Sequence, residues 1–264
     1  MKKIITLILA AALTFTACLS FTACSTVDDI AAVKEKGKIV VGITDYEPMD
    51  YKDDNGKWIG FDAELAQMFA EELDVDCEFF EIADWGAKVA ELNSNQFDLI
   101  WNGMTASNEL GKQIDLSIAY AKNAQVIVVK KGVSVPDKEA VKSMSVAVES
   151  GSAGDKTATA EKIAKINAVD KQLTALFEVA SGNSDAAMID LTMAESVVGK
   201  GEYANLEIVQ DIAYGEEVFA VGMRKNSNLT DELNKFLKAK YEDGTMEKLL
   251  EKYAVSLNKA ELEK

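Results

Sequence analysis

The sequence of 264 residues contains no histidine, only two prolines and a single arginine, Arg224. Without histidine, neither a Ser-His-Asp nor a Cys-His catalytic site can form, and no His-ligated metal site is possible. A G-x-x-x-x-G-K-[ST] phosphate loop is also missing, which argues against nucleotide hydrolysis by this chain. We therefore expect no catalytic residues, no metal and no cofactor.

The N-terminal segment has the features of an export signal. Lys2 and Lys3 precede an apolar run that ends in two copies of Phe-Thr-Ala-Cys, at Cys18 and Cys24. The run is too short and wrongly flanked for a stable membrane span. It resembles a bacterial lipoprotein signal, which implies a signal peptide over residues 1–23, a lipid on Cys24 and a tether over residues 24–36. Cys18 is the alternative lipidation site, and a cleaved secretory peptide without lipid is the alternative to both.

Cysteine and charge limit the partners further. Outside that segment Cys77 is the only cysteine, so no intramolecular disulfide can form and packing must hold the fold together. The formal charge is −16, and removal of Lys2 and Lys3 with the signal would make it −18. Such a charge excludes a nucleic-acid partner, because binding a phosphate backbone needs clustered cations. We expect an extracytoplasmic protein anchored to the cell membrane by its lipid.

Short apolar runs alternate with helical periodicity along the rest of the chain. Residues 38–43 predict a buried strand, and apolar residues at helical spacing predict a helix over residues 61–73 with Asp62 as its cap. Further strands are predicted at residues 75–80, 97–101, 125–129 and 145–148, and further helices at residues 85–92, from Ser152, and at 228–241 and 246–253. This alternation favours largely parallel sheets covered by helices on both faces.

No Pro- or Ser-rich linker divides the chain, so two lobes would have to be joined by ordered segments. Residues 125–129 and 217–223 are the candidates for these crossings. Ligands of open parallel sheets bind outside the carboxyl ends of the strands. The loops after Ile43, Trp101, Val148 and Ile189 are therefore where we expect a site, while Trp101 itself is predicted to face the core.

Several motifs in order resemble the extracytoplasmic solute-binding proteins of ABC importers for polar amino acids. They include Gly60-Phe61-Asp62, then residues 97–100 before Asn102-Gly103-Met104-Thr105, and Ser184-Asp185 leading to Asp190. The resemblance implies a two-lobed type II periplasmic-binding fold, each lobe a mostly parallel sheet flanked by helices, joined by two crossover segments. It places lobe 1 at residues 37–123 plus 219–264 and lobe 2 at residues 124–218.

The resemblance also implies a set of ligand-binding residues. Asp190 matches the acid that binds an α-ammonium group, Tyr46 and Trp85 flank the ligand side chain, and Gly103 and Thr105 meet its carboxylate. The glycine-bearing turn at Ser152 would offer backbone N–H groups to an anion, although a plain helix cap is an alternative for Ser152 and a helix N-cap one for Asp190. The expected ligand-binding positions are Tyr46, Trp85, Asn102, Gly103, Met104, Thr105, Leu110, Gly151, Ser152 and Asp190.

One position departs from the family. The motif that starts at Thr105 ends in an arginine that grips the ligand carboxylate, and here that position is Leu110. A helix N-terminus stabilises an anion by ~0.3–2 kcal/mol, less than the ~3–5 kcal/mol typical of removing one partner of a buried ion pair. Three interpretations remain: Lys112 takes over as a point charge, the ligand lacks an α-carboxylate, or high-affinity binding has been lost. We favour a changed, amine-bearing ligand.

The resemblance implies a small polar solute, a membrane permease as partner, and a monomer that is not an enzyme. A sensor, or an enzyme resembling the dehydratases built on the same scaffold, is the alternative.

Overall fold

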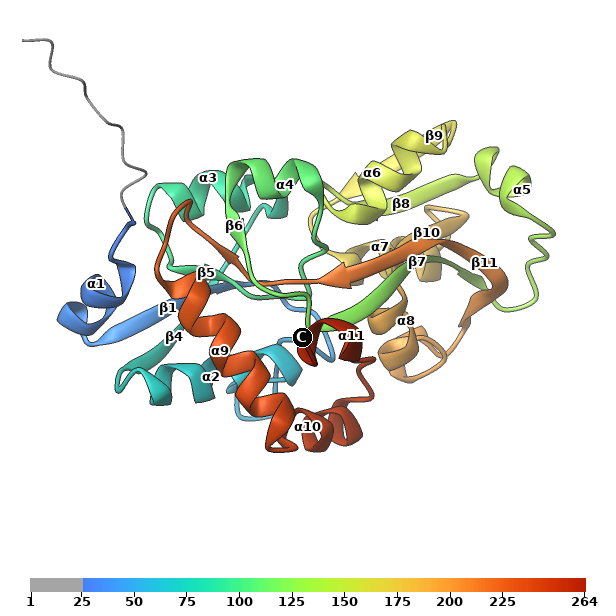
Figure 1. Cartoon of the computed structure of the whole chain (residues 1–264). Helices are drawn as coiled ribbons and strands as arrows, with labels where there is room; N and C mark the ends of the chain where they lie inside the picture. Colours follow the sequence, from blue (N-terminus) through green and yellow to red (C-terminus); the bar gives the residue numbers. More distant parts are fainter. Residues whose placement is uncertain (1–25) are drawn as a thin grey trace, which may run out of the picture.

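The computed structural model describes residues 26–264 and consists of two lobes, each built on its own sheet (Figure 1). The predicted signal peptide, residues 1–23, and both candidate lipidation sites, Cys18 and Cys24, lie outside the described residues. The expected two-lobed α/β fold of the type II periplasmic-binding class, with two connecting segments, is confirmed.

The first lobe holds the sheet with strand order β4-β1-β5-β12-β6. Strands β1 (Lys38–Ile43), β4 (Asp76–Glu81), β5 (Leu99–Ile100) and β6 (Asp115–Leu116) run in the same direction, and β12 (Gly222–Met223) lies antiparallel between β5 and β6. The ribbon of β2 (Tyr51–Lys52) and β3 (Trp58–Ile59) belongs to the same lobe. Its helices are α1 (Asp29–Lys36), α2 (Phe61–Glu72), η1 (Trp85–Ala87), α3 (Lys88–Asn93), α4 (Asn108–Gln113), α9 (Leu229–Glu242), α10 (Thr245–Tyr253) and α11 (Lys259–Leu262).

The second lobe holds the sheet with strand order β11-β7-β10-β8-β9. Strands β8 (Ser145–Glu149), β9 (Lys165–Val169) and β10 (Ala186–Asp190) are parallel, whereas β7 (Ala121–Lys130) is antiparallel to both β10 and β11 (Leu206–Phe219). The helices are α5 (Lys138–Lys142), α6 (Ala153–Ala160), α7 (Gln172–Ser181), α8 (Leu191–Val197) and η2 (Gly201–Tyr203).

Two neighbouring antiparallel segments connect the lobes. The N–H of Tyr120 donates to the carbonyl of Phe219 at 3.0 Å, and the N–H of Ser117 donates to the carbonyl of Val221 at 2.9 Å. Residues 125–129, which the sequence suggested as the first crossing, pair with β10 and so lie inside the second sheet. The first crossing therefore comes several residues earlier than expected, while the exact lobe boundaries, 37–123 plus 219–264 and 124–218, stay a prediction.

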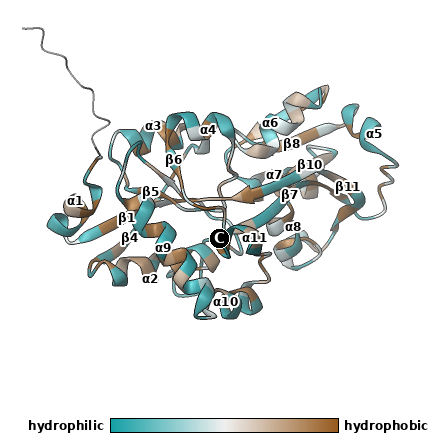
Figure 2. Ribbon diagram, viewed as in Figure 1, coloured by the Kyte–Doolittle hydropathy of each residue, from teal (hydrophilic) through white to brown (hydrophobic). Residues whose placement is uncertain are grey.

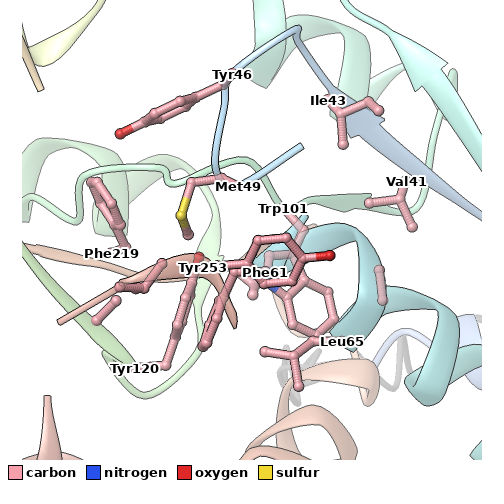
Figure 3. Close-up of a cluster of buried hydrophobic side chains, with 14 of the residues drawn as sticks. Val41, Ile43, Tyr46, Met49, Phe61, Leu65, Trp101, Tyr120, Phe219 and Tyr253 are labelled. Carbon is pink, nitrogen blue, oxygen red and sulfur yellow. The ribbon is translucent and has the colours of Figure 1, made fainter. Parts of the chain in front are cut away.

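Apolar packing fixes both sheets and places the loops that follow them. Trp101 is 0% exposed and contacts the rings of Phe69 and Tyr120, which confirms that it faces the core. Figure 3 shows part of this cluster, with the Phe61 and Tyr120 rings stacked near each other and Tyr46 extending from the loop above them. Helices α9 and α10 carry both hydrophilic and hydrophobic residues (Figure 2), and α10 packs against α9 and α2.

The predicted capping role of Asp62 is wrong. Helix α2 begins at Phe61 with Gly60 as its N-cap, and the N–H groups of Phe61 and Asp62 bond to the carbonyls of the preceding loop. The Asp62 side chain is instead buried, where Oδ2 accepts hydrogen bonds from the Gly103 N–H at 2.6 Å and the Tyr120 hydroxyl at 2.7 Å. Asp62 thus fixes the position of the loop after β5.

Candidate functional site

A cavity of about 70 Å³ lies between the lobes, next to the carboxyl ends of β1, β5, β8 and β10. All ten positions expected from the sequence line it. Six further residues complete the lining: Lys88, Ser107, Glu149, Ala153, Lys156 and Gln172. The structure therefore brings the predicted set together, although the binding role of each member stays a prediction.

In the wall from the first lobe, polar groups form hydrogen bonds with neighbouring residues of the protein. Asn102 accepts a hydrogen bond from the Thr44 N–H at 2.8 Å and donates to the Thr44 hydroxyl at 2.7 Å, so it ties the loop after β5 to the loop after β1. Gly103 has φ +54°, and a Cβ there would lie 2.7 Å from the Tyr46 ring. Its N–H is occupied by Asp62, so in this structure it does not point a free donor at a ligand.

The second lobe contributes the acidic end of the cavity. Asp190 is 5% exposed and accepts hydrogen bonds from the amides of Asn123 (2.5 Å) and Gln125 (2.6 Å) on Oδ1 and of Gln172 (2.5 Å) on Oδ2. Asp190 is the N-cap residue of α8, but its side chain makes no capping bond. Burial and the nearby Glu217 raise the pKa of Asp190 to about 6, so it is mostly ionised at neutral pH.

Glu217 adds a second carboxylate beside Asp190. Its Oε2 accepts from the Thr105 hydroxyl at 3.0 Å and from the same two amides, Asn123 at 3.1 Å and Gln125 at 2.9 Å. Within residues 26–264 neither carboxylate forms an ion pair, so two carboxylates that share neutral donors leave a net negative charge here. This end of the cavity favours a positively charged group.

Tyr46 and Glu149 present protonated groups to the same region. Burial, with Asp190 as the next cause, raises the pKa of the Tyr46 hydroxyl well above its usual value, so it remains a donor. Burial and Asp190 also raise the pKa of Glu149 to about 8, although Lys88 opposes the shift. A carboxyl group with that pKa is mostly neutral at pH 7 and can donate a hydrogen bond.

Lys88 supplies a positive charge that the sequence did not predict. Its side chain starts at the first residue of α3 and is buried, with the residue 6% exposed. The ammonium lies 4.5 Å from the centre of the Trp85 ring and donates to the carbonyls of Trp85 at 2.9 Å and Gly151 at 3.5 Å. Burial, reinforced by Lys156, lowers the pKa of Lys88 to about 8.

The turn at Ser152 starts helix α6, as the helix-cap alternative expected. The Ser152 hydroxyl accepts a hydrogen bond from the Asp155 N–H at 3.2 Å. Gly151 has φ +70°, and a Cβ there would lie 2.6 Å from the Cα of Gly86 in the first lobe. The two lobes therefore meet at this point backbone to backbone.

Leu110 is buried in an apolar cluster with Trp85 and Met104 and lines the cavity with a hydrocarbon side chain. Lys112, the lysine suggested as its replacement, is exposed and does not line the cavity. The structure places Lys88 and Lys156 there instead. Lys88 stands three residues after Trp85, and helical residues at this spacing share a face, so that spacing was the available sequence signal.

In the described part of the chain, no helix is long and apolar enough to cross a membrane. Within residues 26–264, no group of acidic or cysteine side chains is arranged to hold a metal ion.

Comparison with known proteins identifies the family. The sequence profile of the bacterial extracellular solute-binding proteins, family 3, matches residues 39–256. The arginine-binding extracellular protein ArtP of Bacillus subtilis is 31% identical over 257 residues, covering 96% of this chain and 98% of ArtP.

Two solved structures are also similar. An ancestral arginine-binding protein bound to arginine has 34% identity and a TM-score of 0.75, covering 82% of this chain and 98% of its own. The ancestral amino acid-binding protein AncCDT-1, a precursor of cyclohexadienyl dehydratase, has 31% identity and a TM-score of 0.77. The match covers 86% of this chain and 99% of AncCDT-1. On this evidence the chain belongs to the bacterial extracellular solute-binding proteins of family 3.

Proposed function

We propose that this protein is the lipid-anchored substrate-binding component of an ABC importer, and that it captures a small amino-acid-like or amine-bearing solute between its lobes. The observation that carries the proposal is the cavity around Asp190, which is lined from both lobes by the ten positions expected to bind ligand. Relatives named as arginine-binding and amino-acid-binding proteins support the ligand class.

The surroundings of Asp190 favour the binding of an ammonium group. A charged amine that leaves water for an enclosed cavity needs a carboxylate and further acceptors to replace its hydration. The Asp190 carboxylate is held in place by three amide donors, and Glu217 strengthens the negative potential. The cavity volume of about 70 Å³ favours a small solute.

Capture by lobe closure is supported by contacts between the lobes. Lys171 of the second lobe lies 2.8 Å from Glu81 of the first, and the Ser196 hydroxyl donates to Glu47 at 3.0 Å. A hinge closure of this kind draws its free energy from ligand contacts that form only when both lobes meet. A closed lobe pair would then dock on a membrane permease and deliver the solute to it.

Anchoring rests on the N-terminal segment alone. A lipid on Cys24, or on Cys18 as the alternative, would keep the protein at the outer face of the cell membrane near its permease. Mass spectrometry of the mature N-terminus tests this part: the first residue and the mass of its lipid identify the cysteine used, and an unlipidated, cleaved N-terminus contradicts anchoring.

Ligand binding is tested with the mature chain. A thermal-shift screen of amino acids, amines and small cations, followed by calorimetry of the hits, should identify a ligand. The Asp190→Asn variant should bind this ligand at least roughly 30-fold more weakly than the wild type, as expected when one partner of a buried charge pair is removed. Asp231→Asn removes the same charge from an exposed position of α9 and should leave affinity unchanged. Equal affinity in the wild type and Asp190→Asn would refute the proposed site.

An enzyme is the second candidate, because AncCDT-1 is described as a precursor of a dehydratase and Glu149 is a protonated acid inside the cavity. Incubation of the mature chain with each hit, followed by NMR, separates the two functions. Product formation that Glu149→Gln abolishes would favour the enzyme, and unchanged ligand favours the binding protein.

A further inference from the structure

Lys88 is a buried cation without an acidic partner. Among the residues that the structure describes, its ammonium forms no ion pair, and its hydrogen bonds go to two neutral carbonyls, of Trp85 and Gly151. Arg224, which is also largely buried, is held by Asp29 and Asp98. Glu149 and Asp84 act on Lys88 through space, but neither forms an ion pair with it, so this buried ammonium can still bind an anion.

The neighbouring turn of α6 offers further donors at the same place. The carbonyl that Lys88 contacts belongs to Gly151, directly before the N-cap Ser152. The backbone N–H groups of Ala153 and Gly154, at the start of α6, have no acceptor among residues 26–264. Free N–H groups of a first helical turn favour an anion, and Ala153 of this turn lines the cavity together with Lys88 from the other lobe.

The opposite charge stands at the other side of the same cavity. Asp190, with Glu217 behind it, lies on the second lobe at the end of β10. A cavity that carries an unpaired cation and an unpaired carboxylate is complementary to a ligand that carries both charges. An amine without a carboxylate would leave Lys88 unsatisfied in an enclosed space, which is unfavourable.

We propose that Lys88 binds the anionic group of the ligand, so that the ligand is a zwitterionic amino acid whose carboxylate meets Lys88 and the first turn of α6 while its ammonium meets Asp190. This inference rests on the proposed function. It replaces the interpretation that the ligand lacks an α-carboxylate because Leu110 stands at the arginine position. The charge comes from α3 instead of α4, and Lys88 is a specificity-determining residue.

The test compares each amino acid that binds with its decarboxylated amine, for example L-serine with ethanolamine and L-alanine with ethylamine. Calorimetry is done on the wild type, Lys88→Met, Lys88→Arg and Lys112→Met. Loss of the Lys88 charge should weaken amino-acid binding by roughly 30-fold or more and leave amine binding unchanged. Lys88→Arg should retain most of the affinity, and Lys112→Met, which removes an exposed lysine of α4, should retain all of it.

A rescue variant separates a lost contact from a damaged fold. In the Lys88→Met background, Leu110→Arg returns a cation to the same cavity and should recover at least tenfold of the lost amino-acid affinity. Thermal unfolding of each variant without ligand checks that the fold is intact.

The outcomes are distinct. Amino-acid binding that depends on Asp190 but survives Lys88→Met would overturn the inference and keep the proposed function. Binding of amines but of no amino acid would also overturn the inference and keep the proposed function. Loss of amino-acid affinity in Lys112→Met, but not in Lys88→Met, would assign the ligand carboxylate to Lys112. A wild type that binds neither amino acids nor amines would overturn the proposed function, and the inference with it.

Discussion

Replacing Gly151 with alanine should weaken ligand binding by obstructing contact between the lobes. A Cβ at Gly151 would lie 2.6 Å from the Cα of Gly86 and 3.1 Å from its nitrogen, both backbone atoms that cannot rotate away. Ordinary contact starts at 3.4 Å, so the lobes must separate by about 1 Å at this point. The hydrogen bond from Lys88 to the Gly151 carbonyl, already 3.5 Å long, would be lost.

The size of the effect has two parts. Gly151 has φ +70°, where an alanine costs ~1–2 kcal/mol, and this strain exists whether the lobes are open or closed. It lowers the free energy of unfolding without changing affinity. The contact with Gly86 acts only in the closed state, where one lost hydrogen bond costs about 1 kcal/mol and poorer enclosure of the ligand adds to it. We expect roughly tenfold weaker binding, equivalent to about 1.4 kcal/mol.

Gly132→Ala is the matched control. Gly132 also has a left-handed backbone, with φ +85°, but a Cβ there meets nothing within 4 Å. Urea unfolding should show a similar loss of stability in both variants, and calorimetry should show weaker binding only in Gly151→Ala. Unchanged affinity in Gly151→Ala, or an equal loss in Gly132→Ala, would refute the argument that the lobes touch at this point when ligand is bound.

Three further predictions follow from buried ionisable groups. Because the pKa of Lys88 is lowered to about 8, amino-acid affinity measured by calorimetry should fall as the pH rises from 7 to 9. Glu149, whose pKa is about 8, loses its proton over the same range, so Lys88→Arg should show a smaller fall, and an equal fall in both proteins would contradict the role of Lys88. Burial raises the pKa of Asp62 to about 7, so the stability that its proton contributes is fully present below about pH 4 and is lost as the pH rises through 7. Urea unfolding should therefore show a stability decrease of up to about 4 kcal/mol over that range that Asp62→Asn reduces, and an equal decrease in both proteins would contradict it. Burial raises the pKa of the Cys77 thiol to about 12, so a chain that starts after Cys24 should react with a disulfide reagent at pH 8 only when unfolded in urea; rapid reaction of the folded protein would contradict this.

The sequence was sufficient where one segment determines the outcome. Strand β1 was predicted with its observed ends because five apolar or glycine residues follow Lys38 without interruption. The site loops were predicted because they follow apolar strands and ligands bind at such ends. The family resemblance then selected positions within those loops, and the cavity contains all ten.

The orientation of a charged side chain could not be predicted where it depends on contacts between segments far apart in the sequence. Lys88 resembles a surface lysine in sequence, and it is buried because Trp85 and Leu92 pack η1 and α3 onto the sheet and turn its stem inward. The pairing of Asp190 with Gln125 depends on the register between β10 and β7, which no local pattern encodes. Asp62 has the spacing of a helix cap, but Gly60 starts the helix and leaves the carboxylate free for Gly103.

The positions of the two charges suggest how binding and closure are coupled. Asp190 and its amide donors Asn123, Gln125 and Gln172 all belong to strands or helices of the second sheet, so an ammonium group gains that contact whether or not the lobes meet. Lys88 lies on the first lobe and the N-terminus of α6 on the second, so an anion gains both contacts only in the closed state.

A ligand can shift a conformational equilibrium only by its difference in affinity for the two states, and a change from 1:99 to 99:1 requires about 5.5 kcal/mol. Close charge pairs at interfaces have coupling energies of about 1.5–7 kcal/mol, a range that includes this requirement. Under the proposed mechanism, the ligand ammonium therefore provides affinity and the ligand carboxylate drives closure. Lys88, at the boundary between the lobes, then takes the place of the arginine that the family has at the position of Leu110.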